Sequence, residues 1–148
     1  RASLEAIRIF RNHRDATPAE LIALVHGALR SLRGAAVAAA RIDEALGRVT
    51  FSGLGNVTAQ IYANTRCTQR LVSMNGTAGH EVSRIQEFTC PWPSDGLLLM
   101  HSDGLSSSAG LETRPALARH DPTLIAGVLY RDFGRRHDDA TVVVAKAA

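Results

Sequence analysis

The feature that most constrains the fold is a short apolar run, Leu-Leu-Leu-Met at residues 97–100, which lies between two Asp-Gly turn signals. The run is too short for a helix, and it lacks the polar alternation of a strand with one solvent-facing side. It therefore predicts a strand that is buried on both faces, with further layers covering it on each side. Residues 101–103, His-Ser-Asp, would lie at the carboxyl end of this strand.

Two cap-and-proline signals predict helices. Thr17 to Glu20 combines a cap, a proline for the first turn and a capping-box glutamate, and apolar residues then recur at helical spacing up to Leu32. Gly34 is expected to end this helix in a left-handed conformation. Asp121-Pro122 repeats the signal and predicts a helix that stops at Gly134. An earlier short helix is predicted from three apolar residues at helical spacing, Leu4, Ile7 and Phe10.

The region between the helices predicts a long antiparallel meander, because apolar and polar residues alternate between turn signals. The expected strands are 35–42, 48–52, 57–63, 69–73 and 82–88, followed after the 97–100 strand by a closing strand at 140–145. We expect the first strand to be central and packed by the preceding helix. A bulky residue at Ala36 or Ala38 should then overpack the core and cost about 1–3 kcal/mol.

Composition indicates one soluble globular domain, because the 148 residues are 45% hydrophobic and only 21% charged. No apolar run approaches the ~20 residues of a bilayer-spanning helix, and no leader pattern opens the chain. The net charge of +3 is scattered rather than gathered in a basic stripe with aromatics. The short apolar runs and the scattered charge predict neither a membrane nor a nucleic-acid partner. Because only Cys67 and Cys90 are present, we expect a cytoplasmic protein.

Two acidic elements stand at strand ends, Asp103 after the buried strand and Asp138-Asp139 before the closing strand. Carboxylates at such positions suit the hard cations Mg²⁺ and Mn²⁺, which prefer oxygen ligands. Ser-Asp-Gly is also a common turn, and Asp-Asp is a common cap before a strand. Spacing alone therefore leaves both a metal site and a purely structural role open.

Other kinds of site fit the sequence less well. The six histidines have neither helical His-x₃-His nor finger spacing for zinc, and no Gly-x-Ser-x-Gly elbow supports a serine hydrolase. Glycines at 53, 55, 76 and 79 lack the following helix of a phosphate-binding loop, so we expect tight turns. Arg135 and Arg136 suit either a substrate phosphate or the carboxyl end of a helix, and the sequence leaves both open.

An ordered set of short motifs resembles the SpoIIE-type protein serine phosphatases, a bacterial branch of the metal-dependent type 2C phosphatases. The motifs are Arg33-Gly34-Ala35-Ala36-Val37, Gly53-Leu54-Gly55-Asn56, Asn75-Gly76 with Gly79, residues 98–105 (Leu-Leu-Met-His-Ser-Asp-Gly-Leu) and residues 138–144 (Asp-Asp-Ala-Thr-Val-Val-Val). The resemblance runs from end to end. It is greatest to the small phosphatases that reset anti-anti-sigma or stressosome proteins.

The resemblance implies an α+β fold, an αββα four-layer sandwich of two mainly antiparallel sheets flanked by helices. Asp103 and Asp138 would be catalytic metal ligands, and Asp139 would support a ligand or cap the strand. The family has two further aspartates, in a Gly-Asp element and in an Asp-Gly-x-Gly-His-Gly element, and neither motif occurs in the 148 residues. We therefore expect residues 1–148 to be the carboxy-terminal greater part of one phosphatase domain, without its amino-terminal strands.

The function implied is hydrolysis of phosphoserine or phosphothreonine on a STAS-type regulatory protein, an anti-anti-sigma factor or stressosome component. Two Mn²⁺ or Mg²⁺ ions would activate the attacking water, with no covalent intermediate. The alternative is a non-catalytic pseudophosphatase that binds a partner in a sigma-factor pathway. Either way, we expect the Asp103 and Asp138 carboxylates within ~8 Å of each other at one end of the sandwich. The substrate protein, the physiological metal and the oligomeric state stay open.

Overall fold

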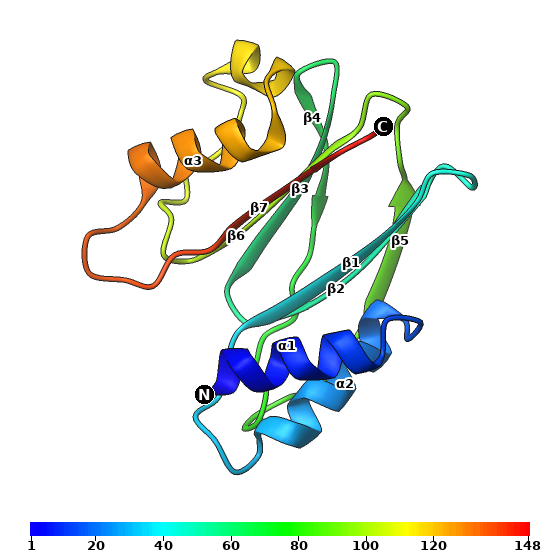
Figure 1. Cartoon of the computed structure of the whole chain (residues 1–148), viewed down its shortest axis with the longest axis vertical. Helices are drawn as coiled ribbons and strands as arrows, with labels where there is room; N and C mark the ends of the chain where they lie inside the picture. The colour runs from blue at the N-terminus through cyan, green and yellow to red at the C-terminus, as the bar shows by residue number, and fades with distance from the viewer.

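Two β-sheets lie face to face between helices in the structure, a computed structural model that describes all of residues 1–148 (Figure 1). The helices are α1 (Ala2–Asn12), α2 (Pro18–Leu29) and α3 (Pro122–Phe133), and a short 3₁₀ helix, η1 (Pro115–Arg119), precedes α3. The strands are β1 (Val37–Asp43), β2 (Arg48–Leu54), β3 (Val57–Ala63), β4 (Arg66–Leu71), β5 (Glu87–Pro91), β6 (Leu97–Ser102) and β7 (Val142–Lys146).

The layers follow the order helix, sheet, sheet, helix. One sheet has the strand order β1-β2-β5 and is covered by α1 and α2, and the other has the order β4-β3-β6-β7 and is covered by α3 (Figure 1). Every named strand pair is antiparallel. This arrangement confirms the predicted α+β sandwich.

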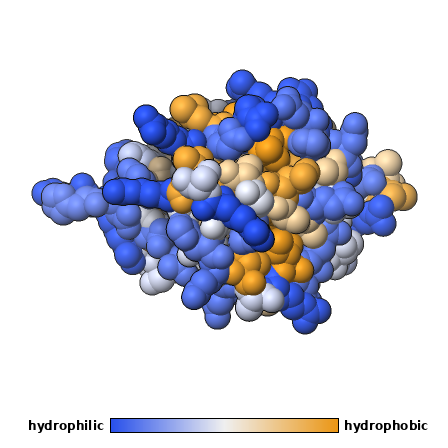
Figure 2. All heavy atoms as spheres, turned by 90° about the horizontal axis from the view of Figure 1, so that it is seen from below, coloured by the Kyte–Doolittle hydropathy of each residue, from blue (hydrophilic) through white to orange (hydrophobic).

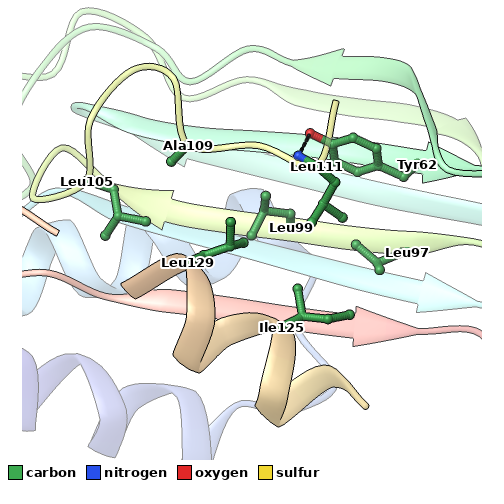
Figure 3. Close-up of a cluster of buried hydrophobic side chains, with 8 residues drawn as sticks. All are labelled: Tyr62, Leu97, Leu99, Leu105, Ala109, Leu111, Ile125 and Leu129. Atoms are coloured by element: carbon green, nitrogen blue, oxygen red, sulfur yellow. Dashed lines mark hydrogen bonds between the residues drawn. The ribbon is translucent and has the colours of Figure 1, made fainter. Parts of the chain in front are cut away.

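Three hydrophobic clusters fill the spaces between the layers, and β6 contributes to two of them. Leu97 and Leu99 point into the cluster under α3 (Figure 3), whereas Leu98 joins Val49 of β2 in the cluster between the sheets. All three leucines are 2% exposed or less. The prediction of a strand buried on both faces is therefore confirmed. Burial of each leucine side chain stabilises the fold by about 1.5–3 kcal/mol.

The start of α2 is capped as the sequence predicts, but its end differs. Thr17 Oγ1 accepts a hydrogen bond from the backbone N–H of Glu20, and Glu20 Oε2 accepts one from the N–H of Thr17. The helix ends at Leu29, and Gly34 does not adopt a left-handed conformation. A Cβ on Gly34 would instead clash with the side chain of Thr77, so this glycine serves a close approach of two segments.

Helix α1 is confirmed, but the residues that predict it are exposed to solvent. Leu4, Ile7 and Phe10 are 72%, 47% and 55% exposed, whereas Ile9 is buried in a cluster with aliphatic residues of α2. Figure 2 views this side of the molecule and shows apolar atoms open to solvent among polar ones. No helix of the structure has the length and apolar character needed to cross a bilayer.

Two predictions about the meander are wrong. The first strand lies at the edge of its sheet rather than at its centre, and Ala36 is exposed before β1 begins, so overpacking is not expected there. Residues 72–86 form only isolated bridges, and the next strand, β5, pairs with β2 in the opposite sheet. Gly76 and Gly79, with φ of 140° and 94°, allow the chain to cross between the sheets instead of turning back as a hairpin.

A buried phenol anchors the loop that covers the α3 side of the sheet. Tyr62 is 1% exposed, and its hydroxyl accepts a hydrogen bond from the N–H of Leu111 at 3.2 Å (Figure 3). The same hydroxyl lies 3.0 Å from Glu112 Oε2 and 2.8 Å from Gln60 Oε1. Burial, reinforced by the neighbouring Glu112, raises the pKa of Tyr62 above its ordinary value.

Tyr62→Phe is expected to lower the free energy of unfolding by about 1–3 kcal/mol, because the Leu111 N–H loses its partner in a buried place. The raised pKa means that the native state keeps the phenol proton that the unfolded chain releases. This contribution is complete below pH ~10 and is lost as the pH rises through the folded-state pKa. Urea denaturation between pH 7 and 11 measures both effects. Tyr130→Phe, at a 55% exposed position, is the matched control, and equal losses in the two variants would contradict the expectation.

Candidate functional site

Antiparallel pairing of β6 with β7 brings the two acidic elements to one end of the four-stranded sheet. In such a pair the end of one strand lies beside the beginning of the other, and here His101 pairs with Val142. Asp103 follows β6, and Asp138 and Asp139 precede β7. The structure therefore places all three predicted site residues on neighbouring loops.

Hydrogen bonds to the main chain hold these loops together. Ser102 Oγ accepts a hydrogen bond from the N–H of Thr141 at 3.0 Å and donates one to the carbonyl of Asp139 at 3.4 Å. The N–H of Arg135 donates to the carbonyl of Gly104 at 2.8 Å. A Cβ on Gly104 would clash with the Asp139 carbonyl, so the approach of the loops requires a glycine.

Asp103 presents an exposed carboxylate that Asn56 orients. Asn56 Nδ2 donates a hydrogen bond to Asp103 Oδ2 at 3.3 Å from the turn between β2 and β3. The preceding Gly55 has φ of 90°, and a Cβ there would lie 2.9 Å from the Cβ of Ala36. The motif that ends in Asn56 thus brings an amide to the site. Spacing along the chain did not indicate this contact, because 47 residues separate Asn56 from Asp103.

The two other predicted residues, Asp138 and Asp139, are exposed, and their carboxylates make no hydrogen bond or ion pair within the chain. The Asp138 N–H lies 3.5 Å from the carbonyl of Arg135 in a turn. Asp139 contacts Ser102 through its main-chain carbonyl. Both carboxylates are therefore free to meet a ligand.

A polar hollow of about 320 Å³ opens beside Asp103. Its polar lining residues are Asn56, Thr58, Ser73, Asn75, Ser107 and Arg135. His101 also lines it and is only 4% exposed. Its Nδ1 lies 2.9 Å from the Ser102 carbonyl, which can only accept, so Nδ1 carries a proton there, and the buried Nε2 has no hydrogen-bond partner.

The donor chemistry at this end suits a hard divalent cation, because the available groups are carboxylate, amide and hydroxyl oxygens. Asp103 and Asp138, the predicted ligands, each present an exposed carboxylate at this end. The 148 residues contain no group of three or more His, Cys, Asp or Glu side chains arranged to bind an ion. Waters or further ligands would complete the coordination, as is usual for Mg²⁺.

Larger hollows lie elsewhere, and several of their charged groups, though not Arg119 or Arg66, already have partners. One of about 460 Å³ contains Asp95, which accepts from the Asn64 N–H, and Lys146, which donates to two carbonyls of the chain. Another of about 730 Å³ contains Glu112, which pairs with Arg70. Neither hollow includes Asp103, Asp138 or Asp139, so size does not select the site.

Comparison with known proteins identifies the family. The family model described as stage II sporulation protein E, SpoIIE, matches residues 2–148. The chain belongs to the SpoIIE family. Comparison of the sequence with curated proteins finds no match.

Solved structures share the SpoIIE fold of this chain. A protein from work on the bacterial stressosome, a modular system adapted to control secondary messenger signaling, is 25% identical with a TM-score of 0.86, covering 97% of this chain and 74% of its own. RsbX in complex with magnesium is 16% identical with a TM-score of 0.81, covering 99% and 73%. The Mycobacterium tuberculosis serine/threonine phosphatase PstP is 20% identical with a TM-score of 0.75, covering 98% and 80%. The predicted resemblance to SpoIIE-type phosphatases is confirmed.

Gly104→Ala is expected to destabilise the protein by about 1–3 kcal/mol, because the added methyl forces apart the loops that carry Asp103 and Asp139. Gly127→Ala is the matched control, since a Cβ at this position in α3 meets nothing within 4 Å. The control should be stabilised by about 0.5–1 kcal/mol through helix propensity. Thermal denaturation of both variants measures the difference, and a Gly104→Ala protein as stable as the wild type would contradict the close packing.

Proposed function

We propose that this chain carries the carboxy-terminal metal-binding half of a phosphatase site, which hydrolyses phosphoserine or phosphothreonine on a regulatory protein. The observation that supports this most is the meeting of the Asp103 loop with the Asp138-Asp139 loop at one end of the sandwich. Family membership adds the chemistry, because serine/threonine phosphatases share this fold.

The roles of the chain's residues follow from their contacts. Asp103, oriented by Asn56, and Asp138 would bind two Mn²⁺ or Mg²⁺ ions together with the upstream aspartates that the family resemblance implies. When bound, such ions activate water for attack on phosphorus and neutralise phosphoryl charge. Asp139 supports the arrangement through its carbonyl, which accepts the hydrogen bond of Ser102.

The proposed substrate is a phosphorylated STAS-type protein, an anti-anti-sigma factor or stressosome component, and the proposed location is the cytoplasm. This rests on the likeness to RsbX and to a protein from work on the stressosome. A non-catalytic binding module is the second candidate. It is favoured by one observation, that the chain's own side chains form no three-ligand metal cluster.

Asp103→Asn in a chain extended upstream to include the two further aspartate motifs is expected to lower the Mn²⁺-dependent rate on a phosphoserine STAS-type protein. The loss should be about 100-fold or more, the scale on which one preorganised electrostatic group acts. Asp138→Asn should behave alike. Asp15→Asn, which changes an exposed aspartate outside the site, should leave the rate unchanged. Calorimetric titration with Mn²⁺ alone should show weaker binding by the two site variants only.

The 148-residue chain by itself is expected to hydrolyse this substrate far more slowly than the extended chain and to bind Mn²⁺ weakly, because two carboxylates cannot hold two divalent ions as four do. Phosphate release at matched Mn²⁺ concentration compares the two proteins. Full activity in the short chain would falsify the four-aspartate mechanism. An extended chain that binds the phosphoprotein but never hydrolyses it would favour the binding module.

A further inference from the structure

Arg135 is the only cationic side chain in the polar hollow beside Asp103. We propose that Arg135 binds the phosphoryl group of the substrate, an inference that rests on the proposed function and adds a substrate-binding residue to it. The backbone position is fixed, because the Arg135 N–H donates to the Gly104 carbonyl at 2.8 Å. The main chain of Arg135 is thereby tied to the loop that carries Asp103.

The guanidinium of Arg135 makes no ion pair within the chain. The four ion pairs of the structure involve Arg8, Arg70, Arg114 and Arg131, and Arg135 makes none, nor any side-chain hydrogen bond. Arg131, only four residues away, is by contrast engaged by Asp132. Because a guanidinium offers a planar fork of N–H donors, it binds phosphate oxygens through two parallel hydrogen bonds.

The other polar groups of the hollow also suit a phosphate. Ser106 and Ser108 hydrogen-bond to each other at 2.6 Å, which leaves Ser107 as the serine of this loop that lines the hollow. Asn75, which is distant from Ser107 in the sequence, also lines the hollow, and its side chain makes no hydrogen bond. The oxygens of an ionised phosphoryl group accept hydrogen bonds. The side chains of Ser107 and Asn75 can donate them. With about 30 Å³ needed per water, a hollow of about 320 Å³ holds a phosphoryl group with its waters.

Charge separation within the hollow fits the same occupant. Asp103 and Arg135 both line it, yet their charged atoms do not form an ion pair. Their carboxylate and guanidinium are therefore each available, one to a cation and the other to the phosphoryl oxygens. The adjacent Arg136 also follows α3, but it does not line the hollow. A favourable charge at the carboxyl end of the helix would apply to both arginines, whereas contact with the phosphoryl group would involve Arg135 alone.

The first test measures binding of a phosphoserine peptide to the 148-residue chain by isothermal titration calorimetry, with and without Mn²⁺. Arg135→Ala should weaken binding by about 10- to 100-fold, the range for charge-assisted hydrogen bonds. Arg135→Lys should recover part of this loss, since lysine keeps the charge but not the fork. Arg136→Ala is the matched control and should bind as the wild type does. The unphosphorylated peptide should bind none of the proteins.

Equal losses in Arg135→Ala and Arg136→Ala would overturn the proposal, because they indicate a general effect of charge. So would unchanged binding in Arg135→Ala, or no binding by the wild-type chain in the presence of Mn²⁺. Thermal denaturation of each variant separates a binding defect from unfolding. The Arg135 N–H to Gly104 carbonyl bond is a backbone contact that all the variants retain.

Kinetics of the extended chain separate this inference from the proposed function. If both hold, Arg135→Ala raises KM for the phosphoprotein, while Asp103→Asn lowers turnover by about 100-fold or more. Hydrolysis that depends on Asp103 but shows an unchanged KM in Arg135→Ala would overturn the role of Arg135 and leave the phosphatase intact. Phosphopeptide binding that depends on Arg135 without any hydrolysis would support the site and reject the enzyme.

Discussion

The antiparallel pairing of β6 with β7 is the interaction on which the rest of the structure depends. It places a fully buried strand beside the last strand, so that the sheet separates two hydrophobic clusters. The same pairing sets the carboxyl end of β6 next to the amino end of β7. One register therefore both closes the core and brings Asp103 to the loop of Asp138.

The core and the site are built from the same strand but make opposite demands on it. The first three residues of β6, Leu97 to Leu99, are apolar and buried, which stabilises the sandwich from both faces. One residue beyond Ser102 the chain presents an exposed carboxylate, held only by an amide of Asn56. Exposed carboxylates with few hydrogen bonds or ion pairs suit a divalent cation, because few existing interactions are lost when the cation binds.

Close approach of backbones is the second constraint, and glycines meet it at the site. Gly104 lets the Asp103 loop lie against the carbonyl of Asp139, and Gly55 lets the turn before Asn56 lie against Ala36. A side chain at either glycine would displace Asp103 or Asn56 rather than a residue of the hydrophobic core. These segments of the chain therefore combine polar side chains at the candidate site with glycines that let the loops pack together.

The sequence by itself determined the local elements, which are the capped helices at Thr17 and Asp121, the buried strand at 97–100 and the acidic residues at strand ends. Helix caps, periodicity and short apolar runs act within a few residues, so they can be recognised without the fold. Only the tertiary structure decided which sheet each strand joins, which face of α1 is buried, and that Asn56 and Arg135 share a hollow with Asp103. The physical reason is that strand pairing and side-chain packing join residues far apart in the chain. Their free energies depend on partners that no local pattern specifies.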